Sequence, residues 1–206
     1  HVEAVLAASP EGLERIEGRV FIDCTGDADV CAMAGAAFER GQTLQPATLN
    51  FRVAGHRLGA EEIQPRYERA LREGRLALED VWGGGIGALI HGRGRGREQC
   101  WAQNPGSNAN HVYPFDGSNA QSRAEGEIAG RRSIDRLMRW LRAEAPGYEN
   151  AFVAACSPFV TARESRRVIG REYVTGDDYI RGVCPETSVC YSFYPIDVHR
   201  GDTESA

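Results

Sequence analysis

The sequence predicts an α/β fold in its first part and an α+β arrangement in the remainder. Three observations support this prediction. The apolar run Val20–Ile22 leads through a polar turn into the small residues 28–34, as a buried strand leads into a helix. Two short strand-like segments precede that run, and a long segment with apolar residues at helical spacing follows Ser122.

The N-terminal residues divide into a hairpin and a strand–turn–helix unit. Val2–Ala7 predicts a strand, Ser9–Gly12 a turn and Leu13–Glu17 the returning strand. Val20–Ile22 is expected to be a strand buried on both faces, because it is apolar without alternation. A turn and a helix over residues 28–34 are expected to follow it.

The turn at residues 23–27 contains groups that suit a ligand. Thr25 has a hydroxyl, Gly26 allows close approach to the backbone, and Asp27 and Asp29 place carboxylates near the start of the helix. Ligands of α/β sheets bind at the carboxyl ends of the strands. Two interpretations follow from the residues alone: a ligand-binding turn, or an ordinary strand-to-helix corner with a capping aspartate.

The middle of the chain predicts a strand over Gln45–Val53 and a helix with apolar positions from Ile63 to Leu71 that ends at Gly74. Gly83–Ala88 matches the pattern G-x-G-x-x-A. The sequence predicts neither a strand before it nor a helix after it, so we interpret it as a loop or an irregular strand. The Arg-Gly alternation at residues 92–97 is interpreted as a solvated loop or a grip for an anion.

The second half predicts a long helix and then shorter elements. Ser122–Glu125 has the pattern of a capping box, and Pro146–Gly147 closes the helix. Strands are expected from Val160 onward. A short helix capped by Thr175–Asp178 and ended near Gly182 follows them. The long helix has an apolar stripe that indicates core packing: Ile128, Ile134, Leu137, Met138 and Leu141.

Composition excludes several classes of function. A net charge of −5 argues against a surface for nucleic acid, and no apolar run approaches the roughly 18–20 residues that cross a membrane. The cysteines form no C-x-x-C pair, so we expect a reduced, mostly buried set and no metal site. They are Cys24, Cys31, Cys100, Cys156, Cys184 and Cys190.

Two ordered blocks of the chain carry a family resemblance. Residues 22–29 read Ile-Asp-Cys-Thr-Gly-Asp-Ala-Asp, similar to the segment IDATGDGD, and residues 163–170, 175–178 and 194–199 are similar to the run RETRRIVG, LTGEDV and YPIDIH. The sequence thus resembles FAD-dependent oxidoreductases of the two-dinucleotide-binding superfamily, such as heterodisulfide-reductase-like and fumarate-reductase-like flavoproteins. Cys24 and the stretch 183–192 depart from the family pattern.

The resemblance implies a domain organisation and a cofactor. Residues 1–45 correspond to part of a Rossmann-like FAD domain with a small antiparallel meander. Residues 46–206 correspond to a mixed substrate or cap domain, with the chain re-entering the FAD domain after about residue 190. The family places FAD against Thr25, Gly26 and Asp27. Some relatives are associated with iron–sulfur clusters, but the cysteine spacing here does not support one.

The strand and G-x-G-x-x-G helix that open such flavoproteins have no counterpart in the sequence. We therefore expect an internal fragment of a longer protein that, expressed alone, binds FAD weakly or not at all. The parent is expected to be an FAD-dependent oxidoreductase that exchanges a hydride with a small organic substrate. The alternative is a non-catalytic remnant or binding module that keeps the fold without flavin.

Candidate catalytic groups lie in the second block. On an alternating strand Arg163 and Arg167 point to one side, where a guanidinium binds a substrate carboxylate or stabilises the reduced flavin. The competing interpretation is that arginines here form surface pairs with Glu164 or Glu172. His199 follows Asp197 by two residues, which suits a proton donor beside the flavin or a structural histidine. We expect Arg163, Arg167 and His199 to converge on one surface.

Overall fold

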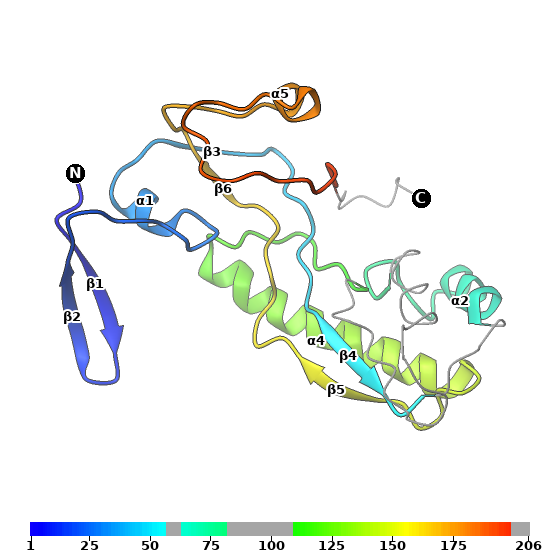
Figure 1. Cartoon of the computed structure of the whole chain (residues 1–206). Helices are drawn as coiled ribbons and strands as arrows, with labels where there is room; N and C mark the ends of the chain where they lie inside the picture. Colours follow the sequence, from blue (N-terminus) through cyan, green and yellow to red (C-terminus); the bar gives the residue numbers. More distant parts are fainter. Residues whose placement is uncertain (57–62, 82–108, 199–206) are drawn as a thin grey trace. The chain divides into compact units, whose positions relative to one another are not determined.

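The computed structural model describes residues 1–56, 63–81 and 109–198 (Figure 1). The fold is mixed α/β, and the described residues form three two-stranded antiparallel sheets. The chain divides into two compact units. Unit 1 comprises His1–Gly41 and Arg166–Asp197, and unit 2 is built mainly from Gln42–Ser165.

Unit 1 begins with the predicted hairpin. Strand β1 (Ala4–Ser9) pairs antiparallel with β2 (Gly12–Glu17), in a register that runs from Ala4 opposite Glu17 to Ser9 opposite Gly12. The Ser9 hydroxyl closes the turn by donating a hydrogen bond to the carbonyl of Gly12 at 3.3 Å. Gly12 has φ +124°, a conformation that favours glycine and explains its place there.

The prediction of a buried strand at residues 20–22 is wrong. Val20 and Ile22 are 79% and 82% exposed, and no described strand pairs with this segment. An apolar run forms a buried strand only when neighbouring strands and covering helices supply its hydrogen bonds and its contacts. The predicted turn after it does form, and helix α1 (Asp29–Met33) follows.

The second sheet of unit 1 joins distant parts of the sequence. Strand β3 (Phe38–Arg40) pairs antiparallel with β6 (Arg166–Val168), with Phe38 opposite Val168 and Arg40 opposite Arg166. Because β6 begins at Arg166, Arg163 does not lie on the same strand as Arg167.

Helix α5 (Gly176–Arg181) confirms the prediction for its segment. Thr175 and Asp178 form a reciprocal capping box at its start. Gly182 ends the helix with φ +66°.

Apolar side chains of unit 1 remain exposed. Asp27 is the one residue that is buried among the described residues of this unit. The expectation of mostly buried cysteines is therefore wrong for those that the structure describes. Cys24, Cys184 and Cys190 are exposed and Cys31 is half-buried, because unit 1 offers them no apolar interior. Cys156 in unit 2 is also exposed.

Unit 2 has its own sheet. Strand β4 (Phe51–Ala54) pairs antiparallel with β5 (Phe152–Cys156), with a register irregularity between Arg52 and Val53. The strand predicted over Gln45–Val53 is thus regular only at its end. Its earlier residues form single bridges, from Ala47 to Val112 and from Thr48 to Thr161.

Two helices of unit 2 follow the sequence prediction. Helix α2 (Ile63–Arg72) buries its predicted apolar face, and Gly74 follows it with φ +66°. Helix α4 (Ala120–Glu144) begins earlier than predicted, because Asn119 is its capping residue. The Asn119 side chain accepts a hydrogen bond from the Ser122 amide at 2.9 Å, whereas the Ser122 hydroxyl accepts one from the Asp116 amide at 2.8 Å.

The hydrophobic core of unit 2 lies between α4, α2 and the β4 segment. Helix α4 packs closely against Leu49 at Gly130, where an added Cβ would lie 3.0 Å from Cβ of Leu49. Ile128, predicted as part of the core stripe, is 53% exposed. The largest fully buried apolar side chains of this core are Leu49, Phe51, Val53, Ile63, Val81, Leu137, Leu141 and Tyr148.

Some sequence predictions lie outside the described residues: the Gly83–Ala88 loop, the Arg-Gly alternation, Cys100 and His199. Within residues 1–56, 63–81 and 109–198, no helix combines the length and the apolar character that spanning a bilayer requires. The same part of the chain contains no group of three or more His, Cys, Asp or Glu side chains that could hold a metal ion.

Candidate functional site

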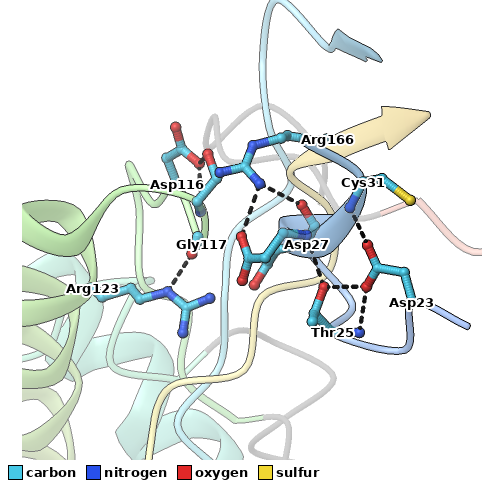
Figure 2. A network of polar contacts seen from close by, with 10 residues as sticks. Asp23, Thr25, Asp27, Cys31, Asp116, Gly117, Arg123 and Arg166 are labelled. Carbon is cyan, nitrogen blue, oxygen red and sulfur yellow. Dashed lines mark hydrogen bonds and ion pairs between the residues drawn. The ribbon is translucent and has the colours of Figure 1, made fainter. Parts of the chain in front are cut away.

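The predicted ligand turn is organised by Asp23. One oxygen of its carboxylate accepts hydrogen bonds from the amide and the hydroxyl of Thr25, at 3.0 and 2.7 Å. The other oxygen accepts one from the amide of Cys31, at 2.9 Å. Figure 2 shows Asp23 between the turn and the first residues of α1. A single carboxylate therefore fastens both ends of the turn.

Hydrogen bonding sets the charge state of these groups. The bond from the Cys31 amide, followed by the two from Thr25, lowers the pKa of the Asp23 carboxyl well below its usual value. The hydrogen bond between Cys31 and Asp23, together with burial, raises the pKa of the Cys31 thiol. Asp23 is therefore a fixed anion at neutral pH, and Cys31 is a protonated thiol with little nucleophilic character.

Helix α1 is capped by side chains that precede its capping position. Its capping position is Ala28, which has φ +54° and provides no side-chain hydrogen bond. Instead, the Thr25 hydroxyl accepts a hydrogen bond from the amide of Asp29 at 2.9 Å. An aspartate does cap the helix, as one interpretation expected, because Asp23 accepts from the amide of Cys31 in the first turn, although the strand expected before this corner does not form.

Arg166 connects this turn to strand β6. Its guanidinium donates to the backbone carbonyl of Asp27 at 3.0 Å and to the carboxylate of Asp29 at 2.8 Å. Figure 2 shows Arg166 reaching across to Asp27. The Arg166 side chain is only 12% exposed. A long-range, nearly buried contact therefore holds the turn in place.

The three predicted cofactor residues lie together in this turn but differ in how accessible they are to a ligand. Thr25 uses its hydroxyl inside the turn, and Asp27 is 7% exposed. Gly26 has φ +83°, and nothing lies within 4 Å of the place where its Cβ would be. The backbone at Gly26 is therefore accessible to a ligand, which is compatible with the predicted contact to FAD, and that contact stays a prediction.

The predicted catalytic residues have separate surroundings. Arg163 belongs to unit 2, where it donates to the carbonyl of Pro46 at 2.9 Å and to the hydroxyl of Thr48 at 3.3 Å. Arg167 belongs to unit 1 and forms an exposed ion pair with Glu39 at 3.4 Å. His199 lies outside the described residues. Their convergence on one surface stays a prediction.

Two cavities of unit 1 adjoin helix α1. One, of about 630 Å³, lies beside β1 and includes Val5, Val30 and Met33 in its lining. The other, of about 570 Å³, lies between α1 and the β3–β6 sheet and includes Arg166. The sequence analysis identified neither cavity and assigned Asp23 no role. The spacing of Asp23 and Thr25 is typical of a turn in which an aspartate accepts from the amide two residues on, and this signal identifies Asp23.

Comparison with known proteins identifies the family. Comparisons with curated proteins and with solved structures gave no match. The model of the family described as FAD dependent oxidoreductase matches residues 1–206, which is the whole chain. The match includes the Asp23–Asp29 turn and the block from Arg163 to Asp197. This chain therefore belongs to the FAD dependent oxidoreductase family.

Proposed function

We propose that the protein transfers a hydride between FAD and a small organic substrate. The match of the family model over the whole chain supports this proposal. FAD, when bound, supplies the redox chemistry through its ring system. The residues of this chain have the tasks of holding the cofactor, orienting the substrate and balancing charge.

We assign the cofactor to unit 1 and the substrate to unit 2. In unit 1 the backbone at Gly26 receives the cofactor, while Asp23 and Arg166 keep the turn in the conformation that exposes it. In unit 2 Arg163 orients the segment around Thr48, which is 4% exposed and bridges to Thr161. Arg167, which lies in unit 1, and His199 remain predicted catalytic residues.

A glycine pair in unit 1 tests the cofactor assignment. In the full-length protein, Gly26→Ala adds a methyl group where the cofactor approaches and also strains the backbone. Gly12→Ala is the matched control, since Gly12 also has positive φ and open space around its Cβ position but lies in the hairpin turn. Flavin content is measured from the absorbance at about 450 nm, where oxidised flavin absorbs.

We expect Gly26→Ala to lose most of its flavin and Gly12→Ala to keep it. Equal flavin content in both variants would contradict the assignment of the turn. A wild-type protein that carries no flavin would instead support the alternative of a non-catalytic member of the family.

The substrate residues have a separate test. Arg163→Ala and His199→Ala should each lower turnover at least about tenfold and leave flavin bound, because one lost charge-stabilising group costs on the order of 2–4 kcal/mol of transition-state stabilisation. Arg171→Ala, an exposed arginine of unit 1, is the control and should keep its turnover. Unchanged turnover in both test variants would make Arg163 and His199 structural residues.

A further inference from the structure

A cavity of about 260 Å³ lies on the β4–β5 sheet of unit 2. Among the described residues that line it, Arg52 contributes the one charged side chain, and none contributes a carboxylate. The lining therefore has a positive charge, although the chain as a whole has a net charge of −5. The described lining residues are Asn50, Phe51, Arg52, Ala155, Cys156 and Ser157.

The pairing of β4 with β5 places the polar side chains of the lining on one face of the sheet. Arg52 lies directly opposite Ala155, and the amide of Ser157 donates to the carbonyl of Asn50 at 2.8 Å. Side chains alternate along a strand, so Asn50 and Arg52 share a face and Phe51, between them, points to the other. Phe51 is 2% exposed in the core of unit 2, so the face that Asn50 and Arg52 share is the outer one.

The donors on this outer face have no acceptor in the part of the chain that the structure describes. The guanidinium of Arg52 is exposed and forms no hydrogen bond or ion pair there. The side-chain amide of Asn50, a half-buried residue, is likewise without a partner among the described residues. A guanidinium has five N–H donors and no acceptor, and the amide nitrogen adds two more donors. An oxyanion supplies the acceptors that such a set of donors lacks.

Small side chains leave room beside Arg52. Ala155 faces it across the sheet, and the hydroxyl of Ser157 is held against the strand by donating to the carbonyl of Asn50 at 3.0 Å. The register irregularity between Arg52 and Val53 ends the regular pairing there, and such irregularities redirect side chains beside functional sites. The volume of about 260 Å³ is below the range of about 300–1,000 Å³ for drug-sized ligands, so the cavity fits a small group and not a nucleotide.

We propose that this cavity binds a small oxyanion. Arg52 donates to it from the planar guanidinium, whose N–H groups match two oxygens of one anion, and the amide nitrogen of Asn50 donates to the same group. A carboxylate and a phosphate share this chemistry, and the experiment below distinguishes them. The proposed oxidoreductase function assigns no ligand to this cavity.

NMR titration of the full chain at low salt tests the site with two pairs of probes. Acetate is compared with the neutral acetamide, and inorganic phosphate is compared with the neutral trimethyl phosphate. The signals followed are the backbone amides of Arg52 and Ser157 and the side-chain amide of Asn50. We expect the charged member of at least one pair to bind at least about tenfold more tightly than its neutral counterpart. Binding of acetate alone identifies a carboxylate site, binding of phosphate alone identifies a phosphate site, and binding of both identifies a site for either oxyanion.

Three variants locate the binding. Arg52→Gln keeps a polar side chain and removes the charge, and should weaken binding of the charged probe at least about tenfold. Asn50→Asp keeps the shape of the side chain but places a carboxylate beside Arg52, and should weaken it by at least as much. The control is Arg132→Gln, which removes the same charge from an exposed position of unit 2 outside the described lining and should change binding less than about twofold. The dispersion of the NMR signals shows whether each variant folds.

Several results would overturn the proposal. They are equal binding of charged and neutral probes, wild-type binding by Arg52→Gln, equal losses in Arg52→Gln and Arg132→Gln, and no saturable shift with any probe up to about 50 mM. None of these results bears on the flavin proposal, because that proposal is judged by flavin content and by the Gly26→Ala variant.

Discussion

Arg166 offers the sharpest test of how unit 1 holds its turn, through the substitution Arg166→Met. Methionine has a similar length but no donors, so the substitution removes the hydrogen bonds to the Asp27 carbonyl and the Asp29 carboxylate. It also removes the guanidinium from the face of Phe38. These contacts link the turn before α1 to strand β6, so their loss should loosen the turn.

The contacts give the size of the effect. A hydrogen bond from a charged donor that is only 12% exposed contributes about 1.5 kcal/mol. The pair with Asp29, whose side chain is 37% exposed, contributes about 0.5 kcal/mol after solvent screening. The cation–π contact with Phe38 adds about 0.5 kcal/mol. The sum of about 2.5 kcal/mol corresponds to roughly a 70-fold change in a local opening equilibrium.

Native-state hydrogen exchange followed by NMR measures this opening. The amides of Asp29 and Cys31 are suitable probes, because they bond to Thr25 and Asp23 and exchange when the turn opens. We expect both amides to exchange roughly 70-fold faster in Arg166→Met. The amides of the β1–β2 hairpin, which Arg166 does not contact in these hydrogen bonds, should keep their rates.

The neighbouring arginine is the control. Arg167 pairs with Glu39 at 3.4 Å, and both side chains are about half exposed, at 55% and 46%. Such a pair contributes little, so Arg167→Met should accelerate the turn amides less than about threefold. Equal acceleration in the two variants, or none in Arg166→Met, would refute the idea that Arg166 fixes the turn.

Three further predictions concern stability. Asp80→Ala leaves Arg136 without its bidentate partner, and should lower the free energy of unfolding, measured by urea titration, by about 2–3 kcal/mol. The control is Asp135→Ala, which removes an exposed ion pair and should lower this free energy by less than about 0.5 kcal/mol. His56 is 3% exposed, its ring nitrogens have no hydrogen-bond partner among the residues that the structure describes, and burial lowers its pKa. As the pH falls below the unfolded pKa of 6.5, the unfolded state gains the proton first, so acidification should destabilise the wild type more than His56→Leu. Ala28→Gly relieves a left-handed backbone at some entropic cost, and should raise the free energy of unfolding by a net of about 0.5–1 kcal/mol, seen as a higher melting temperature.

The elements that sequence predicted well have their determinants close together. In α5, Thr175 and Asp178 bond to each other across one turn, and Gly182 supplies the left-handed conformation that ends the helix. The β1–β2 hairpin likewise depends on a turn between Ser9 and Gly12. Such signals act within a few residues, so the local sequence is sufficient to predict these helix ends and this turn.

Contacts between segments distant from each other explain why other sequence predictions were wrong. Val20–Ile22 has the composition of a buried strand, but composition does not say which segments cover it, and no described residues pair with it. At α4, both Asn119 and Ser122 are good capping residues. The choice between them depends on the Ser122 hydroxyl, which is engaged by the amide of Asp116.

The candidate site combines both kinds of information. A short motif predicts Thr25, Gly26 and Asp27 as cofactor residues, whereas the contact between Arg166 and Asp29 joins residues 137 positions apart. The cavity that contains Arg52 likewise depends on the register of β4 against β5. Cross-strand register follows from the fold and not from the residues of either strand alone, so the sequence did not reveal this arrangement.

Ala28 connects the family pattern to the geometry of the turn. The family segment IDATGDGD has glycine at the place that Ala28 occupies, and Ala28 has φ +54°, a conformation that is unfavourable for a residue with a Cβ by about 1–2 kcal/mol. The structure therefore explains the glycine in the family pattern by backbone conformation. Here alanine is held in the same conformation by Asp23, which bonds to Thr25 and Cys31 on either side of it. A strained conformation that persists because surrounding contacts hold it points to a functional turn, and this agrees with the assignment of the cofactor to residues 25–27.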